Sequence, residues 1–130
     1  MFELAEGVLD RVASTETPQN PIAVVELPAR ATDHAVAGGL LADASFVVVV
    51  DRVSDPGNLG TVLRSAEAAG ADLLVVTPGS VDPFNPKVVR SSAGALFRIP
   101  VVTATLDEVR AAGLTTIGTT SHDSAGRTVT

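Results

Sequence analysis

Residues 46–70 constrain the fold of this chain more than any other stretch. Phe46 to Val50 is a continuous apolar run, rich in valine and closed by polar residues, which is typical of a strand buried on both faces in a parallel sheet. Pro56 and Gly57 then break the strand. The apolar residues that follow recur at helical spacing as far as Gly70, so a strand, a tight loop and a helix are predicted in succession. The helical apolar positions are Leu59, Val62, Leu63, Ala66 and Ala69.

This unit carries two polar residues, Asn58 and Arg64, that packing alone does not require. In open α/β sheets, ligand sites form outside the carboxyl ends of the strands, which is where the loop before this helix lies. Two alternatives stay open for these residues. Asn58 is a suitable helix N-cap, and Arg64 is placed to pair with Glu67 three residues further on. In these two cases the residues have structural roles; in the other alternative, Asn58 and Arg64 belong to a binding or catalytic site.

The composition limits the class of protein. A chain of 130 residues is long enough for one domain, or for one domain with part of a second. No apolar run is long enough to cross a membrane, and no basic and apolar signal segment is seen, so we expect a cytoplasmic protein without a membrane partner. The absence of cysteine and the presence of only two histidines predict that there is no metal site.

The net charge of −6 is unusual for a protein that binds nucleic acid. The acidity is concentrated at the N-terminal end, because residues 1–45 contain seven acidic and two basic residues, whereas residues 46–100 contain five of each. The chain has no Trp or Tyr and four Phe, so a platform for base stacking is not expected. RNA binding is therefore not predicted by composition.

Predicted strands and helices alternate from residue 46 onward, which indicates a parallel, doubly wound α/β sheet with right-handed crossovers. In the first 45 residues the patterns predict a helix at 3–12, a strand at 22–27 and a linker with one helical turn at 29–45. Further strands are predicted at 72–77, 101–103 and 115–119, helices at 87–97 and 106–112, the last with a capping box from Thr105 to Glu108, and a frayed polar end at 121–130.

The motif helix also resembles a known family. The string Asp-Pro-Gly-Asn-Leu-Gly at 55–60, followed by Arg-Ser-Ala at 64–66 and Ala-Gly at 69–70, resembles the first motif of the SpoU (TrmH-like) RNA 2′-O-ribose methyltransferases of the SPOUT superfamily. Residues 85–95 resemble a further segment of that family. The resemblance implies an α/β fold with a knotted C-terminal part, a homodimer, S-adenosylmethionine as cofactor, and rRNA or tRNA as substrate.

The resemblance also assigns roles to single residues. It makes Asn58 and Arg64 the catalytic residues, with Arg64 also contacting RNA phosphate beside the ribose 2′-hydroxyl. Arg52 and Arg90 are predicted to be further RNA contacts. A guanidinium is effectively always protonated, so stabilisation of a developing alkoxide suits Arg64 better than proton abstraction.

The sequence departs from the family pattern beyond residue 120. The family's second motif, a strand followed by Gly-x-Glu, and its third, an Ile-Pro-Met-type segment followed by Ser-Leu-Asn-Val, do not occur here. These motifs form most of the cofactor pocket and the knot, so we expect an incomplete fold that lacks the knotted C-terminal part. Thr119 and Thr120 are the remaining candidates for cofactor binding, although a turn at the end of a strand explains them as well.

The resemblance divides the chain into two parts. Residues 1–45 resemble the tail of an N-terminal RNA-substrate-binding domain plus a linker, and residues 46–130 the first part of the methyltransferase domain. Three functions remain open: a fragment, inactive alone, of an RNA ribose methyltransferase; a non-catalytic RNA-binding or dimerising relic of that fold; and an unrelated nucleotide-binding module. The absence of a Walker-type Gly-Lys-Ser/Thr loop, and of Gly-x-Gly-x-x-Gly after a strand, argues against the third.

Overall fold

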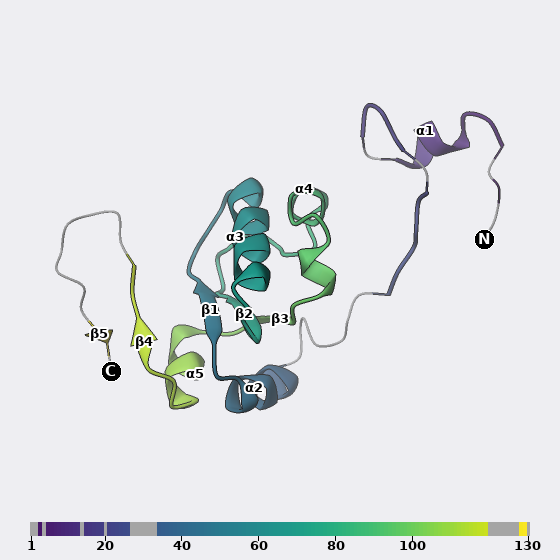
Figure 1. Ribbon diagram of the computed structural model, residues 1–130. Helices are drawn as coiled ribbons and strands as arrows, with labels where there is room; N and C mark the ends of the chain where they lie inside the picture. The colour runs from purple at the N-terminus through teal and green to yellow at the C-terminus, as the bar shows by residue number, and fades with distance from the viewer. Residues whose placement is uncertain are drawn as a thin grey trace.

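The centre of the molecule is a three-stranded parallel sheet with the strand order β1-β2-β3 (Figure 1). The computed structural model describes residues 3, 5–13, 15–19, 21–26, 34–119 and 128–129. All four residues of β2 are buried, as expected for a central strand with both faces covered. The parallel α/β class predicted from the sequence is confirmed. The strands are β1 (Val47–Val50), β2 (Leu73–Val76) and β3 (Val101–Thr103).

Helices cover both faces of this sheet (Figure 1). The first face is covered by α3, α4 and η2, and the second by α2 and α5. Alternate side chains of β2 supply the two cores, because Leu74 points to the first face and Leu73 to the second. The bounds are α2 (His34–Asp43), α3 (Pro56–Ala68), α4 (Pro86–Ser91), the 3₁₀ helix η2 (Ala95–Phe97) and α5 (Leu106–Ala111).

The motif strand and the motif helix lie where the sequence predicted them. The strand predicted at 46–50 is β1, and the helix that follows Pro56 is α3. The predicted capping box of α5 is also confirmed, because the Thr105 side chain accepts a hydrogen bond from the Glu108 backbone N–H and the Glu108 carboxylate accepts one from the Thr105 backbone N–H.

The single helix predicted at 87–97 is wrong, because two residues within this range have left-handed backbone conformation. Ala93 has a φ of 49° and Gly94 a φ of 85°, which is left-handed backbone that glycine tolerates and alanine rarely adopts. This pair ends α4 and turns the chain into η2. The turn directs Arg98, just after η2, back toward α3.

The predictions for the N-terminal region need three corrections. The helix predicted at 3–12 is only α1 (Val8–Val12), which buries no residue. The strand predicted at 22–27 is wrong for its described residues, which have no regular structure; Val24 is 99% exposed. The linker predicted at 29–45 contains the ten-residue helix α2, which buries Leu41 in the second core.

The fourth strand predicted at 115–119 does not join the parallel sheet. It is β4 (Thr116–Ile117), which pairs antiparallel with β5 (Thr128–Val129). The frayed end predicted at 121–130 is therefore wrong at β5, and its other residues lie outside the described part of the chain. β4 is too short, and too exposed at Ile117, to extend the central core.

Candidate functional site

The N-terminus of α3 is capped by Asp55, not by Asn58. The Asp55 carboxylate accepts a hydrogen bond of 2.8 Å from the Asn58 backbone N–H, and Pro56 occupies the first helical position. The interpretation of Asn58 as an N-cap is therefore wrong. The Asn58 side chain is exposed, and it makes no hydrogen bond within the described part of the chain.

Arg64 does not pair with Glu67, so the second structural alternative is also wrong. Arg98 takes Glu67 instead: its Nη2 donates to Glu67 Oε2 at 2.9 Å, and its Nε donates to Oε1. The same guanidinium lowers the pKa of the Glu67 carboxyl below its usual range. Arg64 is exposed, and among the residues that the structure describes it has neither an ion pair nor a hydrogen bond.

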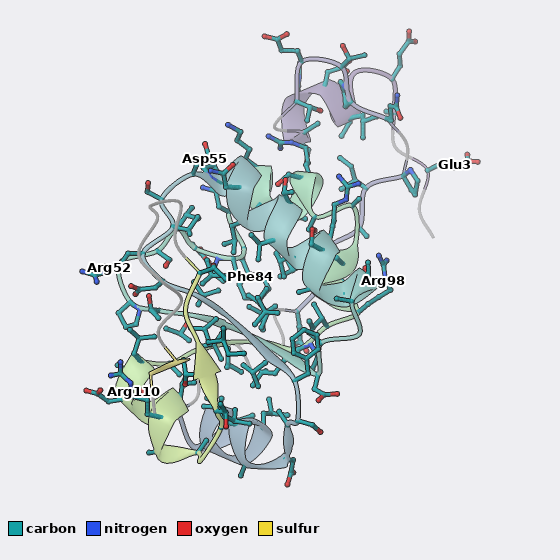
Figure 2. The ribbon with its side chains drawn as sticks, turned by 60° about the vertical axis from the view of Figure 1, so that its left-hand side comes forward. Glu3, Arg52, Asp55, Phe84, Arg98 and Arg110 are labelled. Carbon is teal, nitrogen blue, oxygen red and sulfur yellow. The ribbon has the colours of Figure 1, made fainter. Side chains whose placement is uncertain are left out.

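Arg64 lines a groove of about 410 Å³ between α3 and the turn that follows α4. Figure 2 shows Asp55 at the start of α3 and Arg98 beside its far end, so the groove lies toward the C-terminal half of the helix. Its walls are polar and charged on both sides. The groove is lined by Thr61, Arg64, Ser65, Glu67 and Ala68 of α3, and by Ser92, Ala93 and Arg98.

The helices α3 and α4 are in close contact at Gly60 and Ser91. A Cβ atom added to Gly60 would lie 1.9 Å from Ser91 Oγ and 2.8 Å from the Ser91 backbone carbon. The Ser91 hydroxyl donates to the Lys87 carbonyl at 2.7 Å, within its own helix. Ser92, which follows Ser91 at the end of α4, is also buried.

A second polar cluster fixes the loop at the carboxyl ends of β1 and β2. The buried Thr77 hydroxyl donates to Asp51 Oδ1 at 2.8 Å and accepts from the Arg52 backbone N–H at 3.0 Å. Hydrogen bonding from Thr77, and then from Arg52, lowers the pKa of Asp51. Arg52 has a φ of 50°, which is uncommon for a residue with a side chain. The cluster therefore holds a strained loop at the entrance to α3.

The part of the chain from β1 onward, motif helix included, matches one family. The SpoU rRNA Methylase family model matches residues 45–129. The chain belongs to the SpoU family. The match contains the capped helix α3, the groove beside it and the Asp51–Thr77 cluster.

Individual SpoU relatives extend the match toward the N-terminus. The chain is 41% identical over 128 residues to the 23S rRNA (guanosine(2553)-2′-O)-methyltransferase RlmP of Bacillus subtilis, which covers 95% of this chain and 48% of the relative. It is 41% identical over 87 residues to the 23S rRNA (uridine(2479)-2′-O)-methyltransferase of Streptomyces viridochromogenes, which covers 29% of that protein. The chain therefore spans about half the length, or less, of these relatives.

Solved structures confirm the fold at similar identity. An rRNA methyltransferase from Sinorhizobium meliloti in its AdoMet-bound form matches at 37% identity with a TM-score of 0.50, over 56% of this chain and 30% of that chain. The SpoU methyltransferase AviRb from Streptomyces viridochromogenes matches at 37% identity with a TM-score of 0.51, over 59% and 32%.

The three arginines predicted to contact RNA do not form one patch around the groove. Arg64 lines it, whereas Arg52 and Arg90 are not among its lining residues. Arg52 is exposed at the carboxyl end of β1 and pairs with Asp51 at 3.3 Å. Figure 2 places it on the opposite side of the molecule from Arg98. Arg90 is exposed on α4.

Of the two residues predicted to border the cofactor, Thr119 lies in the described part of the chain. Thr119 is exposed and follows β4, which lies outside the parallel sheet, and Thr120 lies outside the described residues. Within the described part of the chain there is no group of three His, Cys, Asp or Glu side chains that could hold a metal ion. No described helix is long and apolar enough to cross a membrane.

Sequence reasoning missed Asp51, Thr77 and Arg98, which organise this site, and it assigned Glu67 to the wrong partner. Asp51 and Thr77 each directly follow a buried strand, and polar residues at that position signal a site at the edge of a parallel sheet. No local pattern links Glu67 to Arg98, which lies 31 residues away.

Proposed function

We propose that this chain is the RNA-facing part of an enzyme that methylates the 2′-hydroxyl of rRNA riboses. The observation that carries the proposal is the state of Arg64, an exposed guanidinium without an ion-pair partner among the described residues, in a groove beside the motif helix of a SpoU protein. Two matched relatives are named as 23S rRNA 2′-O-methyltransferases. A planar guanidinium is suited to grip a phosphate through two hydrogen bonds.

The chemistry assigns distinct roles to the two motif residues. Transfer of a methyl group to a ribose requires the 2′-hydroxyl to lose its proton. Arg64 cannot accept that proton because its guanidinium stays protonated. It would instead hold the adjacent phosphate and stabilise the negative charge that develops on the oxygen. Asn58 lies six residues earlier, about 9 Å along the helix axis, where its amide would orient the RNA.

S-adenosylmethionine is the proposed methyl donor, since a matched structure is described as AdoMet-bound. The described residues do not fit it as predicted, because Thr119 is exposed and follows β4, a strand outside the parallel sheet. We therefore expect the 130-residue chain by itself to bind the cofactor weakly and to be inactive alone. Isothermal titration with S-adenosylmethionine tests this, and micromolar binding would contradict it.

The assembly and the remaining RNA contacts are also proposals. The chain would act as a homodimer in the cytoplasm, with residues 1–45 and the exposed side chains of Arg52 and Arg90 adding contacts to rRNA or tRNA. Sedimentation equilibrium tests the dimer, and a monomer at micromolar concentration would refute it.

The decisive experiment measures binding of a labelled 23S rRNA fragment to the wild-type chain and to Arg64→Ala and Arg64→Lys. Loss of one phosphate contact should weaken binding by about tenfold and reduce the salt dependence by about one phosphate. Lysine should restore only part of the loss, because it keeps the charge without the planar fork. Arg110→Ala removes an equal charge from α5 and should have little effect.

The outcomes separate the two leading functions. If Arg64→Ala binds RNA like the wild-type chain, the groove is not the RNA-facing surface. If RNA binding depends on Arg64 but a chain extended with the family's second and third motifs transfers no methyl group to RNA, the chain is a non-catalytic RNA-binding relic.

A further inference from the structure

The ion pair between Arg98 and Glu67 determines whether Glu67 can pair with Arg64 on α3. Glu67 lies three residues after Arg64, a spacing at which opposite charges on a helix are neighbours and attract. An Arg64 engaged by Glu67 would be less available to any other anion. In the structure both carboxylate oxygens of Glu67 are occupied by Arg98 instead.

Arg98 reaches Glu67 because of the left-handed turn after α4. Ala93 and Gly94 reverse the chain, and the absence of a side chain at Gly94 makes room for the guanidinium. A Cβ atom added to Gly94 would lie 2.8 Å from Arg98 Nη1. The two members of the pair thus come from segments that meet only in the folded protein.

The two arginines that line the groove, Arg64 and Arg98, differ in their contacts. Arg98 donates two hydrogen bonds to Glu67, whose side chain is 30% exposed, so each oxygen of that carboxylate accepts from Arg98. Arg64 lines the same groove without a described partner. The carboxylate that could otherwise pair with Arg64 is engaged by Arg98 instead.

We propose that Arg98 is a positioning residue that holds Glu67 away from Arg64, so that the Arg64 guanidinium stays available for an RNA phosphate. This inference rests on the proposed function. It assigns Arg98 no contact with RNA and no part in the methyl transfer itself. Its effect is exerted entirely through Glu67.

The test is a double-mutant cycle on RNA binding by the full chain, with Arg98→Ala, Glu67→Gln and the double variant, using the labelled 23S rRNA fragment. Arg98→Ala releases Glu67 to pair with Arg64 and should weaken RNA binding about two- to fivefold, the effect of one exposed ion pair. Glu67→Gln alone should raise the affinity slightly, because it removes a negative charge from the groove. The double variant should return to the affinity of Glu67→Gln, since no carboxylate then competes.

Matched controls remove the general effect of charge and of stability. Arg110 pairs with Asp107 on α5 at 3.1 Å, so Arg110→Ala, Asp107→Asn and their double variant reproduce the same charge changes away from the groove. Melting temperatures are measured for every variant. A merely structural ion pair would lower the melting temperature in both single variants without the recovery of RNA binding in the double variant.

Each result has one meaning. Recovery of affinity in Arg98→Ala/Glu67→Gln, beyond that of the α5 controls, supports the inference. An affinity loss in Arg98→Ala that Glu67→Gln fails to reverse overturns it and indicates that Arg98 contacts RNA directly. Wild-type affinity in Arg98→Ala overturns it as well. If Arg64→Ala also binds RNA with wild-type affinity, the proposed function is wrong. If Arg64→Ala loses RNA affinity and Arg98→Ala does not, only the role of Arg98 is refuted.

Discussion

The two faces of the sheet share one set of strands, but the helices pack more closely on the first face than on the second. On the first face, α3 and α4 touch through Gly60, and an ion pair joins α3 to the segment after η2. On the second face, α2 and α5 flank a groove of about 310 Å³ lined mainly by alanine, with Ala37 and Leu41 on α2. The proposed site lies on the face with close contacts and left-handed backbone. The difference indicates that exact helix placement matters where charges must be positioned.

The largest effect should come from the core of the first face. Leu74→Ala removes a fully buried side chain packed beneath α3, which should cost about 2–5 kcal/mol of unfolding free energy. Leu73→Ala on the second face should cost less within that range, because small neighbours and the adjacent groove let the site collapse. Urea unfolding of both variants measures this. Equal costs would show that the two faces pack with equal rigidity.

The close contact between α3 and α4 provides the next test. Gly60→Ala places a methyl group against the Ser91 backbone, so the helices must separate, at a cost of about 1–3 kcal/mol. Gly39→Ala is the matched control on α2, where an added Cβ meets nothing within 4 Å. It should instead stabilise the protein by about 0.5–1 kcal/mol. Thermal unfolding compares them, and a stable Gly60→Ala would mean that α3 and α4 tolerate displacement.

The smallest effect should be the dependence of stability on acid. The Thr77 hydroxyl lowers the pKa of Asp51 from an ordinary value of 3.8, so the ionised carboxylate stabilises the folded state above that pH. This contribution is lost as the pH falls through the lowered pKa. Thr77→Val should flatten that part of the stability curve below about pH 4, as measured by urea unfolding at several pH values. A curve of unchanged shape would remove Asp51 from the cluster that fixes the loop.

Several features of the site follow from the sequence because they depend on near neighbours. The valine run predicts β1, the apolar spacing after Pro56 and Gly57 predicts α3, and Thr105 with Glu108 predicts the cap of α5. Each depends on residues within a few positions, where backbone preference and side-chain hydrogen bonds act. The motif that contains Asn58 and Arg64 is also a local string of residues, and it indicated the SpoU family.

Tertiary structure decided the rest. The sequence placed Glu67 beside Arg64, yet the pair formed is with Arg98, because the turn at Ala93 and Gly94 brings a residue 31 positions away onto α3. α2 is stable in the fold because Ala37 and Leu41 are buried against the second face of the sheet, although its own sequence shows no clear apolar stripe. β4 pairs with β5 and not with the sheet. Local periodicity cannot report such contacts, since their free energy arises only when distant segments meet.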